Sequence, residues 1–138
     1  MIDSTCIFCR IVKGDLPSYK LCEDADSLVI LDINPVTKGH CLIIPTRHCS
    51  TLIDADPDLV AKLMRRICHI VPALLKATHT EGFNLFQNNG RCAGQLIPHL
   101  HFHIIPRTSG DNMRFYWHPQ PADKTELEKL TIQVKHYL

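Results

Sequence analysis

The chain has 138 residues, of which 45% are hydrophobic and 21% are charged, and its formal net charge is +1. These values are ordinary for a globular protein, so we expect a single domain over residues 1–138 and see no global charge that would favour nucleic acid. The chain has no apolar run long enough to span a membrane and no basic and apolar secretory signal at its start, which predicts a cytoplasmic protein with reduced cysteines.

The N-terminal segment predicts a short helix over residues 6–13, because apolar residues recur at helical spacing and Gly14 can end the helix. Cys6 and Cys9 lie at its start with C-x-x-C spacing, so both thiolates could bind one zinc ion at about 2.3 Å. The motif is weak evidence on its own, and two reduced thiols are an equally good interpretation.

Three strands are predicted next, over residues 19–23, 28–33 and 39–45. The second contains a continuous apolar run, which is typical of a central strand. Asp32 lies near its end, beside Asn34-Pro35. Its carboxylate could form a turn or accept hydrogen bonds from ribose hydroxyls, and the residues alone favour the turn.

A long helix is predicted from Asp56-Pro57 to about residue 77, with Asp56 as N-cap and Pro57 at the first helical position. An apolar stripe at helical spacing runs along it. Pro72 lies inside this stripe and should kink or split the helix near Val71.

A fourth strand over residues 83–87 leads into a loop that begins with Asn88-Asn89-Gly90. Gly94 has no side chain, so its backbone N–H could approach an anionic oxygen closely. Asn88 could donate an amide hydrogen bond to a phosphate or a leaving group, and Gln95 could do the same or only brace the loop.

The last strand is predicted over residues 99–105, where histidines and apolar residues alternate with the period of a half-buried strand. We expect Leu100, Phe102 and Ile104 on the core side, and His99, His101 and His103 on the other side. Neighbours on one face are about 6.6 Å apart, so three consecutive imidazoles on a regular strand cannot easily share one zinc ion. Separate roles for the three rings are the better interpretation.

The C-terminal region predicts a turn over residues 108–111 and a last helix after Asp123, whose capping box includes Glu126. Trp117 and His118 lie between them, where they could reach over a site or a partner subunit. The apolar face of the last helix is expected to be buried. Its residues are Leu127, Leu130, Val134 and Tyr137. Together, the strand and helix order predicts an α+β fold, an antiparallel sheet of about five strands with packed helices.

The run His99-Leu100-His101-Phe102-His103-Ile104-Ile105 resembles the signature of the histidine triad (HIT) family of nucleotide hydrolases and transferases. The resemblance covers most of the chain to about residue 107. Its further parts are Cys6-Ile7-Phe8-Cys9, Leu31-Asp32-Ile33-Asn34-Pro35, residues 88–95 and Pro106-Arg107. It implies a HIT-like fold and a homodimer.

The resemblance also implies a mechanism, in which His101 attacks the α-phosphorus of a nucleotide, with a purine base favoured, and forms a nucleotidyl-histidine that water hydrolyses. His103 would hydrogen-bond the phosphate or the bridging oxygen. Asn88, the Gly94 N–H and Arg107 would stabilise the phosphate charge, although Arg107 could instead cap its strand in solvent. Asp32 would bind the ribose. An apolar base pocket would contain Ile7, Phe8, Ile11, Ile30 and Ile33, which could equally be ordinary core residues.

A zinc-containing subgroup of the family implies a structural zinc site made of two thiolates and two imidazoles. The ligands would be Cys6, Cys9, His48 and His99. This assignment would direct His99 to a metal and leave His101 and His103 for the nucleotide.

Leu96 departs from the relatives that hydrolyse nucleoside phosphoramidates, which carry a hydroxyl residue there to help the leaving group. Dinucleoside polyphosphates are therefore an equally good class of substrate. Three other functions stay open: a zinc-dependent hydrolase, a nucleotide-binding or interaction protein with little turnover, and a structural zinc module.

Overall fold

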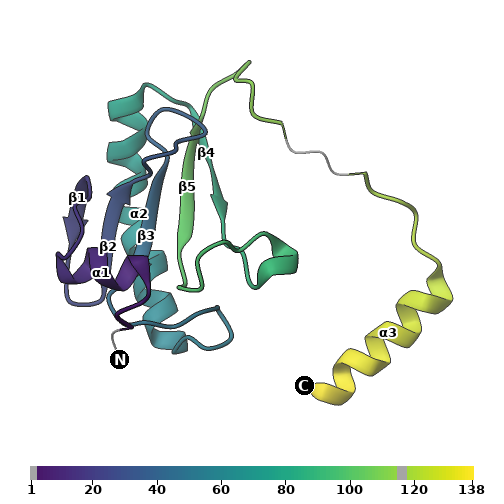
Figure 1. Cartoon of the computed structure of the whole chain (residues 1–138). Coiled ribbons are helices and arrows are strands. Elements are labelled where there is room, and N and C mark those ends of the chain that lie inside the picture. The colour runs from purple at the N-terminus through teal and green to yellow at the C-terminus, as the bar shows by residue number, and fades with distance from the viewer. Residues whose placement is uncertain (1–2, 115–117) are drawn as a thin grey trace.

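The computed structural model describes residues 3–114 and 118–138 and contains a five-stranded antiparallel sheet with the strand order β1-β2-β3-β5-β4 (Figure 1). The elements are α1 (Ile7–Lys13), β1 (Lys20–Glu23), β2 (Ser27–Leu31), β3 (Cys41–Pro45), α2 (Pro57–Thr78), β4 (Gly82–Phe86), the 3₁₀ turn η1 (Arg91–Ala93), β5 (Phe102–Arg107) and α3 (Lys124–Tyr137). The predicted α+β class is confirmed. None of the helices in the described residues has the length and apolarity needed to cross a membrane.

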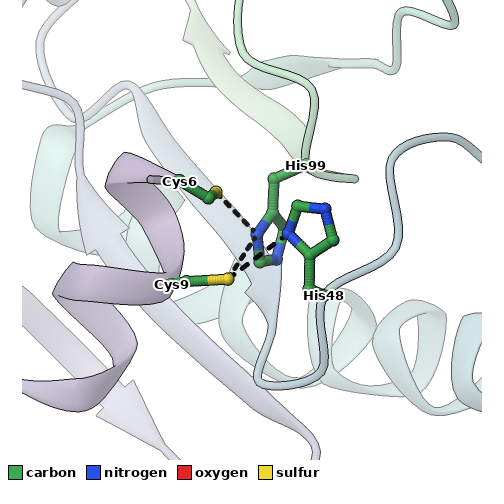
Figure 2. Close-up of side chains that lie close together, drawn as sticks. All are labelled: Cys6, Cys9, His48 and His99. Carbon is green, nitrogen blue, oxygen red and sulfur yellow. Dashed lines mark hydrogen bonds between the residues drawn. The ribbon is translucent and has the colours of Figure 1, made fainter. Parts of the chain in front are cut away.

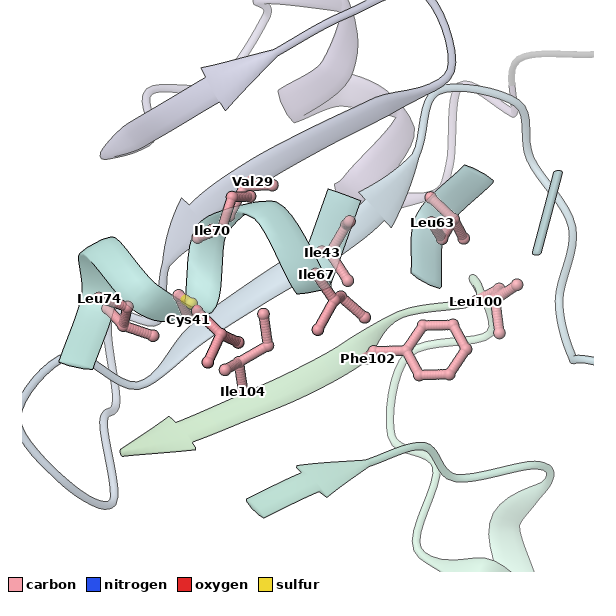
Figure 3. Packing of buried hydrophobic residues seen from close by; sticks show 11 residues of the cluster. Val29, Cys41, Ile43, Leu63, Ile67, Ile70, Leu74, Leu100, Phe102 and Ile104 are labelled. Carbon is pink, nitrogen blue, oxygen red and sulfur yellow. The ribbon is translucent and has the colours of Figure 1, made fainter. Parts of the chain in front are cut away.

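Helix α2 covers one face of the sheet (Figure 3). Its apolar stripe packs against alternate residues of the three central strands. The main members of this cluster are Val29, Cys41, Ile43, Leu63, Ile67, Ile70, Val71, Leu74, Leu100, Phe102 and Ile104. Their burial removes the apolar faces of helix and sheet from water and provides the main core.

Helix α1 lies against the opposite face, where the intervening residues of β2 and β3 form a second apolar cluster with it. Its members are Cys6, Phe8, Cys9, Leu28, Ile30, Leu42 and Ile44. Because both faces are covered, β2 and β3 are apolar without alternation, as the sequence of the second strand indicated. The side chains of His99 and His101 also lie on this face, where both rings contact that of Phe8.

The long helix α2 is continuous through Pro72, so of the two predicted effects near Val71, a kink or a split, the split is wrong. Pro72 and Cys68, whose carbonyl loses its helical donor, are both exposed, which allows water to hydrate that carbonyl. The predicted N-cap is confirmed, because the Asp56 side chain accepts a hydrogen bond from the Asp58 N–H at 2.9 Å.

Strand β5 begins at Phe102 rather than at His99, so the predicted start of this strand was three residues early. Phe102 pairs with Ile43 in the β3–β5 register, and continuing that register would place Leu100 opposite Pro45. Pro45 has no N–H to contribute, so the ladder stops before it. The Leu100 N–H instead donates to the carbonyl of Cys49 at 2.7 Å. His99 and His101 therefore precede the ladder, while the alternation of faces continues through them.

Helix α3 lies apart from the sheet in this chain, and none of its residues is buried (Figure 1). The prediction that its apolar face would be buried is therefore wrong for one copy of the chain. Leu127, Leu130 and Val134 are 50–55% exposed and Tyr137 is 86% exposed. The capping prediction is confirmed, since the Asp123 side chain accepts from the Glu126 N–H at 3.0 Å. Trp117 lies outside the described residues, and His118 is exposed.

Candidate active site

Four side chains from three distant segments meet beside α1 (Figure 2). Cys6 is the N-cap of α1 and Cys9 lies in its first turn, His48 follows β3, and His99 precedes β5. The Cys6 Sγ lies 3.3 Å from His99 Nδ1, and the Cys9 Sγ lies 3.3 Å from His48 Nδ1 and 3.6 Å from His99 Nδ1. We call these four residues the thiol–imidazole set.

The donor atoms of the thiol–imidazole set fit a zinc ion. All four lie within 4.8 Å of one another, and zinc bonds of about 2.3 Å to sulfur and 2.0–2.1 Å to nitrogen imply sulfur–nitrogen edges of about 3.6 Å in a tetrahedron. His99 is fully buried, and its Nε2–H donates to the carbonyl of Pro45 at 3.0 Å. That bond leaves the Nδ1 lone pair directed at the sulfurs, as expected for a metal-binding histidine.

His101 is buried two residues further along the chain. Its Nδ1 lies 2.6 Å from the carbonyl oxygen of His99, and since a carbonyl can only accept, Nδ1 carries the proton. Burial lowers the pKa of His101, which keeps the ring neutral near neutral pH. A neutral ring protonated on Nδ1 has a lone pair on Nε2. The structure therefore gives His101 the protonation state of a nucleophile.

His103 contacts a histidine that sequence reasoning missed. Its Nδ1 lies 2.9 Å from Nε2 of His40, and Nδ1 of His40 lies 3.6 Å from a carboxylate oxygen of Asp32. We call Asp32, His40 and His103 the acid–imidazole row. The sequence contained a signal for the contact between Asp32 and His40. Antiparallel pairing of the second and third predicted strands places these two residues opposite each other, and the Asp32 N–H donates to the His40 carbonyl.

The two carboxylate oxygens of Asp32 have different neighbours. One of its carboxylate oxygens accepts from the Asn34 N–H at 2.8 Å, so the turn-forming interpretation is confirmed. The other oxygen faces His40. The ribose role stays a prediction.

The loop after β4 is held by Gln95, whose side chain is buried. Its amide nitrogen donates to the carbonyls of Ser50 and Ile97, and its Oε1 accepts from the Gly90 N–H at 2.7 Å. The amide of Gln95 is therefore engaged within the loop, which supports bracing rather than phosphate binding.

Gly94 ends η1 with a φ of 83°, in the left-handed region that favours glycine. Its N–H donates to the carbonyl of Arg91 at 3.0 Å, so an anion would have to share or displace that bond. Asn88 lies close by, and its Nδ2 donates to the Gly94 carbonyl at 3.4 Å. The structure thus brings Asn88 and Gly94 together at the loop that precedes the histidines.

A family model for the HIT domain matches residues 13–110 of the chain. The chain belongs to the HIT family. It is 40% identical over 131 residues to adenosine 5′-monophosphoramidase hnt1 of Schizosaccharomyces pombe, covering 94% of this chain and 96% of the relative. It is also 46% identical over 110 residues to adenylylsulfatase HINT3 of Arabidopsis thaliana, covering 80% of this chain and 56% of that relative, so it spans about half of that protein's length.

Solved structures agree with this HIT assignment. A protein from Streptococcus mutans matches with a TM-score of 0.93 and 38% identity, covering 98% of this chain and 86% of that one. A zinc-bound histidine triad family protein from Mycobacterium smegmatis matches with a TM-score of 0.77 and 36% identity, covering 97% of this chain and 98% of that one. The predicted family and fold are confirmed.

The apolar residues expected to bind the base divide into two groups in this HIT chain. Phe8 and Ile30 are buried and Ile11 packs beside them in the second cluster, whereas Ile7 is 46% and Ile33 is 76% exposed. Phe8 also joins the two sites, since its ring lies 5.8 Å from that of His99 and 5.1 Å from that of His101. The buried members therefore serve as core, and the two exposed isoleucines are available to a ligand.

Arg107 lies at the far end of β5 from His101, about 20 Å away along the chain. Its guanidinium donates two hydrogen bonds of 2.6 Å to the Asp111 carboxylate and others to Asn84 and to the Met113 carbonyl. The expected phosphate contact is therefore not part of this site, and Arg107 instead fixes the turn that follows β5 in the HIT fold.

Proposed function

We propose that this HIT protein hydrolyses a nucleoside phosphate derivative at its α-phosphorus, through a covalent nucleotide on His101. The observation that carries the proposal is the 2.6 Å hydrogen bond from His101 Nδ1 to the His99 carbonyl, because it leaves Nε2 as the nucleophilic nitrogen. The phosphoramidase and adenylylsulfatase names of the two relatives support the class of reaction.

The reaction would proceed in two displacements. The Nε2 lone pair of His101 attacks the α-phosphorus, a nitrogen–phosphorus bond forms, and the bond to the leaving group breaks, with the leaving group taking a proton from solvent. Water then attacks the same phosphorus, which releases the nucleoside monophosphate and restores the neutral imidazole. Asn88 would donate a hydrogen bond to a phosphate oxygen, where negative charge grows, and His103 would donate to a phosphate oxygen or to the atom that bridges phosphorus and the leaving group.

The substrate would lie along the α1 face of the sheet. We propose that Asp32 accepts hydrogen bonds from the ribose and that Ile7 and Ile33, both exposed, contact the base. A purine is favoured because its larger ring covers more apolar surface. The leaving group would lie towards the loop that carries Leu96, which is 94% exposed.

We further propose that the thiol–imidazole set holds a structural zinc ion. When bound, zinc would link α1, the segment after β3 and the segment before β5. Four protein ligands leave no open position for water, so the proposal assigns the chemistry to His101 rather than to a metal.

We infer that the protein acts as a homodimer, in agreement with its family resemblance, and that it is cytoplasmic. The apolar face of α3 supports a dimer, because one copy of the chain leaves Leu127, Leu130 and Val134 half exposed. Light scattering should give twice the chain mass, and removal of residues 124–138 should weaken the association.

The decisive experiment combines turnover with trapping. Purified protein is mixed with adenosine 5′-phosphoramidate or with diadenosine polyphosphates and quenched in alkali, which preserves phosphorus–nitrogen bonds, and the intact mass is measured. We expect turnover of at least one substrate and a nucleotidyl adduct that peptide analysis assigns to His101. Binding without turnover or adduct would make the chain a nucleotide-binding protein instead.

A further inference from the structure

The acid–imidazole row contains a hydrogen bond whose direction the structure defines. His40 is buried, and its Nε2 lies 2.9 Å from Nδ1 of His103. Burial lowers the pKa of both rings, that of His103 to about 4, so both are neutral near neutral pH and each carries one N–H. One of the two facing nitrogens must donate and the other must accept.

The neighbours of His40 Nδ1 decide between the two directions. The Val36 main-chain N–H donates to this nitrogen at 3.4 Å, and a backbone N–H can only donate. The nearest Asp32 oxygen is 3.6 Å away, beyond a normal hydrogen bond, while the other oxygen is engaged with the Asn34 N–H. A proton on His40 Nδ1 would face the Val36 donor, so Nδ1 has the lone pair and Nε2 has the proton.

The same three residues could also surround a metal ion, but the distances favour a hydrogen bond. Two imidazoles bound to one zinc ion at 2.0–2.1 Å would place their nitrogens about 3.3 Å apart. The observed 2.9 Å between His40 and His103 is the length of an N–H···N hydrogen bond. A shared proton therefore describes this pair better than a shared cation.

We propose that His40 is a positioning residue that fixes His103 in its Nε2–H tautomer. Because His40 donates to Nδ1 of His103, the remaining proton of His103 must lie on Nε2, the ring nitrogen that faces away from His40. The ring centroids of His101 and His103 are 5.0 Å apart, so an N–H on the His103 ring would lie close to a phosphate bound at His101. In the opposite tautomer, His103 would turn a lone pair towards a phosphate oxygen and repel it.

The catalytic consequence rests on the proposed function, whereas the tautomer itself does not. The first test is therefore NMR of the full protein with nitrogen-labelled histidine and no substrate, in which two-bond correlations distinguish protonated from unprotonated ring nitrogens. We expect His40 and His103 both to carry their proton on Nε2. A proton on Nδ1 of His103 in the wild-type protein would overturn the inference whatever the protein turns over.

Two substitutions of His40 separate positioning from general packing. A glutamine amide can place its N–H near the former Nε2, whereas the shorter asparagine amide reaches only the former Nδ1. We expect His40→Gln to keep the Nε2–H tautomer of His103 and most of the kcat. We expect His40→Asn to produce a mixture of tautomers and to lower kcat about tenfold to a hundredfold with little change in KM.

His69→Asn is the matched control, because this histidine is exposed on α2. It should leave the His103 spectrum and kcat unchanged. An unchanged His103 tautomer in folded His40→Asn would contradict the inference. If the wild-type tautomer is as expected but no substrate panel shows turnover, the proposed function fails while the assignment of His40 stands.

Discussion

His99 and His103 lie two residues to either side of His101, and the comparison of these two flanking rings explains the site. Burial lowers the pKa of each to about 4, so both are neutral. Their partners differ in kind. His99 faces two cysteine sulfurs, and His103 faces another imidazole. Two histidines on one face of one segment therefore have different chemical environments, because segments distant in the chain supply their partners.

His101 is connected to both environments. It donates to the main-chain carbonyl of His99 on one side, and its ring lies beside that of His103 on the other. The first contact puts the proton of His101 on Nδ1 and leaves Nε2 free, and the proposed tautomer of His103 would supply an N–H on the neighbouring ring. Predictions that change one flank at a time can test this division of roles.

The largest effect on turnover is expected from a change of His101, the residue that contacts both flanking histidines. His101→Ala removes the nucleophile, and we expect kcat to fall by several powers of ten. Metal content and nucleotide affinity should change little, since neither flank loses a side chain. Steady-state turnover, metal analysis and nucleotide titration measure the three quantities. Turnover within tenfold of the wild type would exclude His101 as the nucleophile.

The next largest effect is expected from a change beside His99 alone, which leaves the surroundings of His103 intact. Cys9→Ala removes a ligand from the thiol–imidazole set, and we expect zinc to be lost and the melting temperature to fall by about 10 °C. A ligand at 1,000 times its dissociation constant stabilises by about 4 kcal/mol, and each kcal/mol shifts melting by roughly 2–4 °C. Cys68→Ala, on the exposed side of α2, should change neither quantity. Wild-type protein that carries no zinc would contradict the structural metal site.

The sequence was sufficient to predict the order of elements and the faces of the strands. Alternation alone assigned Leu100 and Phe102 to one face and the histidines to the other, and the structure agrees. The errors were in places where distant contacts decide. The start of β5 depends on Pro45 in the facing strand, and the exposure of α3 depends on what lies outside one chain.

The site residues that belong to short sequence motifs could be predicted, and those that do not belong to one could not. Cys6 and His99 carry such motifs, and the structure brings them together. His40 has no motif, and only strand register relates it to Asp32. The guanidinium of Arg107 could be recognised in sequence as a cation, but its capture by Asp111 is a property of the folded turn.

A smaller effect is expected on the free energy of unfolding when the pH is lowered. His103 has a pKa of about 4 when folded and about 6.5 when unfolded, so between these values only the unfolded chain binds the proton. Stability should therefore fall as the pH falls through this window. In His103→Gln, the slope of the unfolding free energy against pH should decrease by up to about 1.4 kcal/mol per pH unit, one proton. Denaturant unfolding at several pH values measures it, and an unchanged slope would mean that His103 is already solvated.

The smallest effect tests whether His103 alone can assist the leaving group. Leu96 stands where phosphoramidate-hydrolysing relatives were expected to have a hydroxyl, and it is 94% exposed, so Leu96→Ser should not disturb packing. If His103 already supplies the hydrogen bond, the added hydroxyl should raise kcat/KM for adenosine 5′-phosphoramidate only a few-fold and leave diadenosine polyphosphates unchanged. A gain of a hundredfold or more would show that the missing hydroxyl, rather than the His40-supported donor, limits the reaction.

The roles of the two donors are compared most directly in the His40→Asn variant. There, Leu96→Ser should restore more activity than it adds to the wild type, because the serine hydroxyl and the His103 N–H would substitute for each other.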